Sequence, residues 1–310
     1  MGSGGSLHAG EQLGYDGYER LLKLLEQRRF DEALIHGRVL LESPDVGLLT
    51  RAKTHNLVCW TLAEGLKRPT PEAALHGEEA VRLGDALGER SITVQALLNL
   101  AAATYSLADW AGARAAYERV GSLLAQEPSL LPYGRILAAE GLAQLDMVAG
   151  RYPEALARLE AAVALCELEE APFMLMEIHR RRALLLVRLD QAEGALGALA
   201  LIDEVIVADG PRALWWKTHL GFTRGQVEIA LGHWKTARPL ATNTLALARE
   251  LGDGPVIAEC LTQLALLDGL EGKRDAKRRA HLALAAAIQS GRRDVVADIR
   301  ARLAKVIDLG

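Results

Sequence analysis

The chain of 310 residues is half hydrophobic and one quarter charged, which excludes an intrinsically disordered protein. Its formal net charge of −4 provides no strong positive field, so direct binding to nucleic acid is not expected. The three cysteines, Cys59, Cys166 and Cys260, lie far apart, which predicts neither a disulfide framework nor a zinc site and is typical of a reducing cytoplasm.

The first thirteen residues, which begin MGSGGS, are expected to form a flexible leader outside the fold. They do not resemble a signal segment, and no uncharged apolar run approaches the ~20 residues that span a bilayer, so we expect a cytoplasmic protein without a membrane partner. From residue 14 onward Ala and Leu are abundant, and aromatic residues make up only 5% of the whole chain. This composition favours helices over strands and predicts an all-α fold.

A short motif returns about every forty residues from residue 30 onward. Its anchor positions in chain order are Phe30, Thr70, Trp110, Tyr152, Ala192, Trp234 and Arg274, which are 40 or 42 residues apart. Three residues after the anchors stand Ala33, Ala73, Ala113, Ala155, Ala195 and Ala237, with Lys277 as the exception. Nine residues before the later anchors stand the small residues Thr61, Ala101, Ala143, Ala183, Gly225 and Ala265. Small residues at fixed positions on two successive helices allow those helices to cross closely.

Each unit therefore predicts an A helix, a tight turn and a B helix. The units are expected to cover residues 14–43, 44–88, 89–128, 129–170, 171–209, 210–253 and 254–291, followed by a capping helix over residues 292–308. Together they are expected to form a single domain from residue 14 to residue 310.

The prolines agree with this division of the chain. Pro71 and Pro153 stand at the start of expected B helices, where proline is tolerated. The joins between units contain Pro44, Pro172, Pro211 and Pro255. Pro239 lies inside an expected B helix and predicts a kink there.

The small residue, the aromatic residue nine positions later and the alanine three positions after that resemble the tetratricopeptide repeat. The resemblance covers residues 14–291, although the usual period of that repeat is about 34 residues. The longer form resembles the sensing domains of bacterial transcription regulators and quorum-sensing peptide receptors, and the long-repeat scaffold proteins of eukaryotes. It implies a right-handed α-solenoid of about seven repeats, with the A helices along a concave groove.

Polar residues recur in columns on these A helices, and the resemblance assigns the columns to the ligand-binding groove. Column members lie fifteen, twelve, eleven or eight residues before an anchor. The expected groove residues are His55, Gln95, Asn99, Glu140, Gln144, Glu177, Arg180, Arg181, His219, Gln226, Glu259 and Gln263. Asn99 is a candidate for holding the backbone of an extended peptide, because an amide both donates and accepts hydrogen bonds. An ordinary hydrogen-bonded helix residue is the alternative for Asn99.

Three consecutive arginines, Arg180, Arg181 and Arg182, fan across more than half of one A helix, at ~100° per residue. Two interpretations stay open. In the first, they bridge carboxylates between repeats, with Glu140 and Glu177 as the partners and Arg180 opposite Glu140, because an unpaired buried charge is costly. In the second, Arg181, with or without Arg180, binds a carboxylate or phosphate of a ligand, since a guanidinium suits bidentate recognition. Arg182 interrupts an apolar stripe of this helix and is expected to have a structural role.

Two further features have a structural interpretation beside a functional one. Trp215 and Trp216 are expected to pack under the preceding loop, with partner anchoring as the alternative. The basic run from Lys273 to His281 is expected to be a solvated face, with contact to an acidic partner as the alternative.

No motif of an enzyme is present: there is no phosphate-binding loop, no HExxH, no GxSxG and no dinucleotide fingerprint. We therefore expect neither catalysis, nor a metal site, nor a cofactor. The function predicted from the sequence is a scaffold that binds a protein or peptide segment. If Arg181 binds the ligand, that segment carries an acidic group. The alternatives are the sensing domain of a signalling regulator, here without a preceding helix-turn-helix segment, and a self-assembling structural protein.

Overall fold

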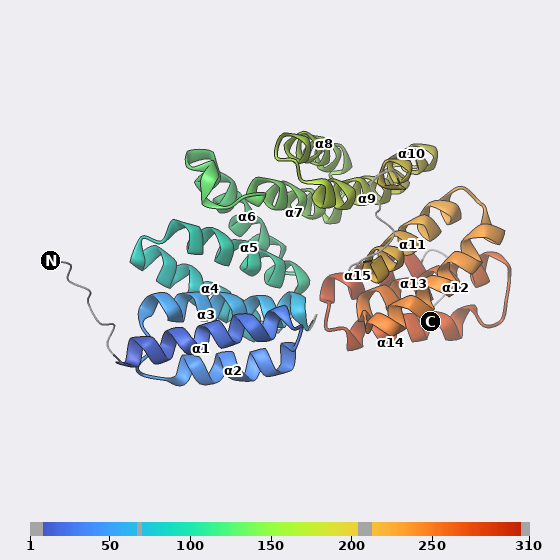
Figure 1. The fold of residues 1–310 in the computed structure, drawn as a ribbon. Helices are drawn as coiled ribbons and strands as arrows, with labels where there is room; N and C mark the ends of the chain where they lie inside the picture. Colours follow the sequence, from blue (N-terminus) through green and yellow to red (C-terminus); the bar gives the residue numbers. More distant parts are fainter. Residues whose placement is uncertain (1–8, 67–69, 204–212, 305–310) are drawn as a thin grey trace. The chain divides into compact units, whose positions relative to one another are not determined.

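The computed structural model describes residues 9–66, 70–203 and 213–304. Within these ranges the chain is helical and contains no strand, so the predicted all-α class is confirmed. The helices follow one another in packed pairs, as in an α-solenoid of helical repeats (Figure 1). No helix in the described ranges combines the length and the apolar character needed to cross a membrane.

The chain divides into two compact units, Met1–Gly134 and Arg135–Gly310, and each is described by itself. Unit 1 contains α1 (Ala9–Glu26), α2 (Phe30–Glu42), α3 (Leu48–Trp60), α4 (Pro71–Leu87), α5 (Arg90–Ser106) and α6 (Trp110–Gln126), with a π-helical turn (Thr61–Gly65) after α3 and a 3-10 turn (Pro128–Leu130) after α6.

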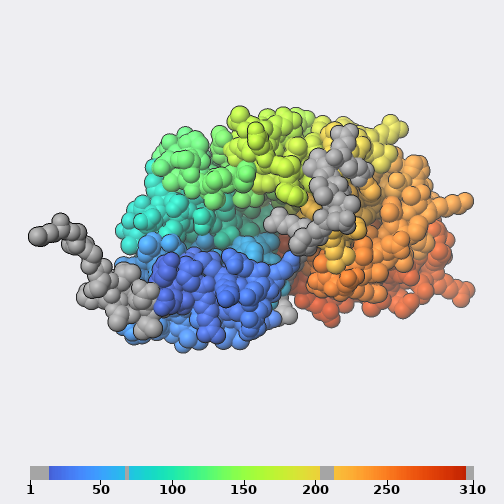
Figure 2. Space-filling model, viewed as in Figure 1, coloured from blue at the N-terminus to red at the C-terminus, as the bar shows by residue number. Residues whose placement is uncertain are grey.

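Unit 2 contains α7 (Gly134–Val148), α8 (Tyr152–Leu168), α9 (Pro172–Arg188), α10 (Ala192–Asp203), α11 (Ala213–Ala230), α12 (Trp234–Leu251), α13 (Gly254–Leu270), α14 (Ala276–Gln289) and α15 (Arg293–Leu303). Odd-numbered helices are A helices and even-numbered helices are B helices. Figure 2 shows α8 and α10, in yellow-green and yellow, at the surface of this unit.

The anchors mark the starts of the B helices. Phe30, Trp110, Tyr152, Ala192 and Trp234 are each the first residue of a B helix, and Thr70 directly precedes one. The alanine column that follows the anchors has no exposed surface, from Ala33 to Ala237. The small column on the A helices is buried as well, with Ala101, Ala143, Ala183 and Ala265 fully so. Both columns therefore line the helix crossings, as predicted.

The A–B turns share one backbone conformation. Two residues before six of the anchors, φ is positive, at Arg28, Ala108, Gly150, Asp190, Gly232 and Gly272. The next amide then donates to a carbonyl five residues back, for example from Arg151 N to Asp146 O at 2.8 Å. This is the left-handed helix ending that favours glycine. A repeated turn of this kind gives each helix pair the same hairpin geometry.

Three details differ from the sequence predictions or extend them. Helix α1 begins at Ala9, inside the expected leader, and α15 covers Arg293–Leu303 of the expected cap. In α14 the buried alanine is Ala276 rather than position 277, because this helix begins two residues after its anchor; Lys277 is consequently exposed. Pro211 and the last residues of the cap lie outside the described residues.

Candidate functional site

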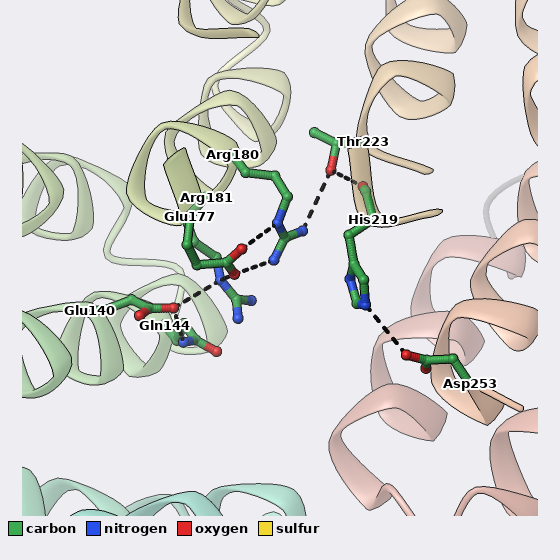
Figure 3. A network of polar contacts seen from close by, with 8 residues as sticks. All are labelled: Glu140, Gln144, Glu177, Arg180, Arg181, His219, Thr223 and Asp253. Carbon is green, nitrogen blue, oxygen red and sulfur yellow. Dashed lines mark hydrogen bonds and ion pairs between the residues drawn. The ribbon is translucent and has the colours of Figure 1, made fainter. Parts of the chain in front are cut away.

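The arginine cluster of α9 lies at the centre of a polar network in unit 2 (Figure 3). Arg180 Nε donates to Glu177 Oε2 at 2.8 Å, and its Nη2 donates to the other oxygen of the same carboxylate. Arg181 Nε lies 2.9 Å from Glu177 Oε1. Because positions three and four residues apart share a helix face, Glu177 is within reach of both guanidinium groups.

One side of the network extends to α7. Arg181 Nε donates to Glu140 Oε1 at 3.1 Å, and Gln144 Nε2 donates to the same oxygen at 3.2 Å. The Arg181 side chain retains 29% of its exposure, whereas that of Glu140 retains 12%. The Arg181 side chain therefore contacts α7 and is also partly exposed to solvent.

The other side extends to α11 and the start of α13. Arg180 Nη1 donates to Thr223 Oγ1 at 3.4 Å, and that hydroxyl donates to the carbonyl of His219 at 2.9 Å. The Nε2 atom of His219 lies 3.3 Å from Asp253 Oδ2 (Figure 3). Asp253 also accepts a hydrogen bond from Val256 N at 3.2 Å, so its carboxylate caps α13. Four repeats of unit 2 thus contribute to one connected network.

Burial and charge set the protonation of these groups. Burial raises the pKa of Glu140, which faces Arg181 and Gln144. Burial alone would also raise the pKa of Glu177, but Arg180 and Arg181 together lower it to about 2. Burial and the neighbouring Arg180 lower the pKa of His219, against the opposing effect of Asp253. At neutral pH the carboxyl group of Glu177 is consequently charged and the imidazole of His219 is neutral.

The structure corrects the pairing expected for the arginines. Glu140 was expected opposite Arg180, but its partner is Arg181, while Arg180 binds Glu177 and Thr223. The reason is the rotation of ~100° per helical residue, which turns Arg181 toward α7 and Arg180 toward α11. Arg180 is 4% exposed and thus belongs to the interior. Arg182 is half-buried, with its Nε shielded from solvent.

Successive A helices are joined by polar contacts at a regular separation. The contacts bridge Asn56 and Asn99, Glu140 and Arg181, Arg180 and Thr223, Phe222 O and Gln263, and Glu259 and Arg302. Each pair is 41 or 43 residues apart. Asn56 and Arg302 are members of these contacts that the anchor columns did not select. Thr223 stands in the column eleven residues before an anchor but was not among the expected groove residues.

The expected groove residues of unit 1 have separate partners. Asn99 Nδ2 donates to Asn56 Oδ1 at 2.8 Å, which connects α5 to α3. His55 Nδ1 lies 2.7 Å from His76 Nδ1, so this imidazole is paired with a B helix of its own repeat. Gln95 is exposed on α5.

Three expected groove residues of unit 2 lie outside the network of Figure 3. Gln226 is half-buried on α11. Gln263 has no exposed surface and donates to Phe222 O at 2.7 Å, so we leave it out of the groove proposed below. Glu259 accepts from Arg302 of α15 at 2.7 Å. Trp215 stacks on His219 with ring centroids 4.0 Å apart, and Trp216 is buried in the core.

Comparison with known proteins identifies similar folds but no similar sequences. No family model matches the chain, and no curated protein matches it. A Rap protein crystallised with Competence and Sporulation Factor is 17% identical, with a TM-score of 0.60 over 96% of this chain and 76% of that protein. Aspartyl phosphate phosphatase F from Bacillus subtilis is 12% identical, with a TM-score of 0.55 over 99% of this chain and 95% of that protein.

A third similar structure is a signal-transduction ATPase of the STAND class with a tetratricopeptide repeat sensor, from Pyrococcus horikoshii. It is 14% identical, with a TM-score of 0.53, and the match covers 96% of this chain and 45% of that protein. The fold is a tetratricopeptide-like helical solenoid. The resemblance found in the sequence is therefore confirmed at the level of the fold.

The basic run of the solenoid is largely neutralised by its own surroundings. A hollow of about 390 Å³ is lined by Arg238, Asp268, Lys273, Arg274, Asp275 and Arg279. The buried Asp268 lies 2.8 Å from Arg238 and 3.1 Å from Arg279, while Glu271 lies within 2.9 Å of Arg238 and Lys273. Internal ion pairs thus occupy most of these cations, which favours the structural interpretation.

No cluster of three or more His, Cys, Asp or Glu side chains suited to a metal ion occurs in the parts of the chain that the structure describes. The polar network instead offers charged and hydrogen-bonding groups on three A helices and at the start of α13. Such an arrangement can position a segment that crosses several helices.

Proposed function

We propose that this chain is a non-catalytic scaffold that binds a peptide or protein segment along the A helices of unit 2. The observation that carries the proposal is the network that joins α7 to α9 through Glu140, Arg181 and Glu177, and α9 to α11 through Arg180 and Thr223. Arg181 and His219 retain side-chain exposures of 29% and 13%, so this face is polar, connected and within reach of solvent.

Likeness of fold supports this proposal. The similar Rap protein was crystallised with Competence and Sporulation Factor, so a solenoid of this kind accommodates a bound factor. We propose Arg181 as the residue that receives an acidic group of the ligand, since its guanidinium can form two parallel hydrogen bonds with a carboxylate. Glu140 and Glu177 hold this guanidinium in place and thereby reduce the entropy lost on binding.

The test is a selection of binding peptides from a random display library on the immobilised chain, followed by calorimetry. Each selected peptide is titrated against wild type, Arg181→Ala, Arg181→Lys and the control Arg249→Ala, which removes an exposed arginine from the B helix α12. We expect Arg181→Ala to weaken binding by about tenfold or more, equivalent to ~1.4 kcal/mol. Arg181→Lys should retain only part of the wild-type affinity, because the lysine ammonium group lacks the planar, two-pronged geometry of a guanidinium.

The control Arg249→Ala should leave the affinity unchanged. Peptides that bind wild type and Arg181→Ala equally would exclude this groove as the binding site. Circular dichroism and thermal unfolding establish beforehand that each variant keeps its helices.

A second candidate function is ligand sensing within a signalling regulator. The similarity to the tetratricopeptide repeat sensor of the STAND protein favours it. In that case a bound peptide should change the curvature of the solenoid and so its scattering profile. A small-angle scattering profile that does not change when a selected peptide saturates the chain argues for a passive scaffold.

A further inference from the structure

The last helix of unit 2 makes a contact far back along the chain. Arg188 Nη2 on α9 donates to Asp298 Oδ1 on α15 at 2.6 Å, across a separation of 110 residues. Helices α11 and α13 lie between these two in the chain. A polar bond that skips two A helices brings α15 onto the same side of unit 2 as the α9 stripe that contains Arg181.

The same region of α15 is bound to α13. Arg302 Nη1 donates to Glu259 Oε2 at 2.7 Å and to Asp298 Oδ2 at 2.9 Å. Arg188, Asp298, Arg302 and Glu259 therefore alternate in charge and join α9, α15 and α13. We call these four residues the latch.

Apolar packing lies directly beside the latch. Leu184, one helical turn before Arg188, packs against the core cluster that contains Phe222, Cys260 and Leu264. Arg181 lies almost one turn earlier on the same helix. At Leu184 the α9 stripe is thus covered by this cluster of α11, α12 and α13, while Arg181 before it and Arg188 after it retain contact with solvent.

The two ends of the latch differ in strength. Arg302 and Glu259 have side-chain exposures of 14% and 15%, and Ile299 and Leu303 of α15 are fully buried against α13 and α14. Arg188 and Asp298 are each 35% exposed, so water and salt compete with their ion pair. The buried contacts between α15 and α13 are therefore stronger than the exposed Arg188–Asp298 pair, and we expect the Arg188–Asp298 pair to open first.

We propose that the latch is a releasable closure of unit 2: opening of the Arg188–Asp298 pair separates α9 from α13 and α15 and uncovers the α9 stripe at Leu184, between Arg181 and Arg188. This inference rests on the proposed function for its purpose, because the uncovered face continues the groove at Arg181. The closure itself is a property of the free chain and can be measured without a ligand.

Cys260 is a natural reporter of the closure. It lies on α13 in the cluster that Leu184 covers, and it has no exposed surface. Cys59 of unit 1 and Cys166 of α8 are equally buried, so they report on unfolding elsewhere. The rate at which a thiol is alkylated depends on its exposure and ionisation.

The experiment measures the alkylation of the full chain by iodoacetamide, with each cysteine quantified separately by peptide mass spectrometry. Arg188→Gln and Asp298→Asn remove the exposed ion pair, while Arg300→Gln removes an exposed arginine of α15 outside the latch. We expect both latch variants to label Cys260 faster than wild type by up to about fivefold, the upper limit for the loss of one exposed ion pair. Cys59, Cys166 and the Arg300→Gln chain should keep wild-type rates.

Equal labelling of Cys260 in wild type and both latch variants overturns the closure. So does a rise shared by all three cysteines, because that result means general loosening. The peptide selection described above reports on the proposed function separately: a latch that opens in a chain without peptide binding refutes the function and leaves the closure standing. If the chain binds peptides but both latch variants label Cys260 at the wild-type rate, the closure is refuted and the proposed function stands.

Discussion

Arg181 and Glu140 are 41 residues apart in the chain, and the 3.1 Å contact between Arg181 Nε and Glu140 Oε1 joins the A helices of two successive repeats. Arg180, the preceding residue, faces the other way and is bound by Glu177 and Thr223. Adjacent arginines thus stabilise opposite sides of α9, one in the interior and one near the surface. This difference separates their expected effects on stability from their expected effects on binding.

The first prediction compares these two arginines. Arg180→Gln removes the charge of a 5%-exposed side chain and leaves the half-buried Glu177 with fewer partners, so we expect a loss of about 3–4 kcal/mol in the free energy of unfolding. Arg181→Gln should cost only about 1–2 kcal/mol, because its site is partly hydrated. Urea denaturation followed by circular dichroism measures both. Equal losses would contradict the distinction between an interior and a surface arginine.

The second prediction concerns the A–B turns. Ala108 has a φ of 62°, in a conformation that glycine adopts without strain. Ala108→Gly should therefore stabilise unit 1 by about 0.5–1 kcal/mol. The reverse change at the equivalent turn of unit 2, Gly150→Ala (φ 73°), should destabilise by about the same amount. Thermal unfolding of the two variants provides the measurement, and shifts of the same sign would refute the explanation.

The fold was predictable because each helix pair repeats the same local signals. The anchors locate the starts of the B helices to within two residues, and the two small columns locate the helix crossings, since these positions depend on local register alone. The glycines at Gly150, Gly232 and Gly272 were a visible signal for the turns, but Arg28, Ala108 and Asp190 hold the same conformation without one. Position in the repeat determines that backbone more strongly than residue type does.

The partners within the site were less predictable. Columns counted from the anchors place Glu140 with Arg180, but contacts between A helices connect residues 41 or 43 apart, and the helix rotates by ~100° per residue. An error of one residue in the expected separation therefore assigns an arginine to the wrong carboxylate. Asp253 lies just before α13, where an aspartate ahead of an apolar run is a capping signal that the columns ignored. The ligand-binding role of the groove residues remains a prediction.

The third prediction uses a close contact in the core of unit 2. A Cβ atom at Gly225 would lie 2.5 Å from Gln263 Oε1, and Gln263 is fully buried with its amide held by Phe222 O. Gly225→Ala should therefore destabilise the chain by about 1–3 kcal/mol, the usual cost of overpacking. Gly197→Ala on α10 is the control, because open space surrounds its Cβ position and alanine favours a helix by up to ~1 kcal/mol. A stable Gly225→Ala variant would mean that Gln263 can move away freely.

The fourth prediction concerns the histidine pair of unit 1. His55 Nδ1 and His76 Nδ1 are 2.7 Å apart, so one ring must donate and the other accept, and a second proton would force two donors together. Burial, the neighbouring His76 and the positive charges of Arg51 and Arg82 lower the pKa of His55 to about 4, although Glu79 opposes them. Burial also lowers the pKa of His76, against the effect of Glu72.

The sign of the pH effect follows from these directions. An unfolded histidine has a pKa near 6.5, so between about pH 6.5 and 4 the unfolded chain binds a proton that the folded chain excludes. The stabilisation from neutral His55 is fully present above pH 6.5 and decreases as the pH falls toward 4. Because His55 is partly hydrated, we expect a loss of about 1–2 kcal/mol between pH 7 and pH 5 from this residue.

His55→Gln should remove that part of the pH dependence, since glutamine cannot titrate. The measurement is urea denaturation of wild type, His55→Gln and the control His281→Gln, which alters an exposed histidine of α14, at pH 7 and pH 5. We expect the control to keep the wild-type difference between the two pH values and His55→Gln to show a smaller one. A wild-type difference in His55→Gln would show that the loss of stability in acid comes from other groups, among which His179 and His219 also have lowered pKa values.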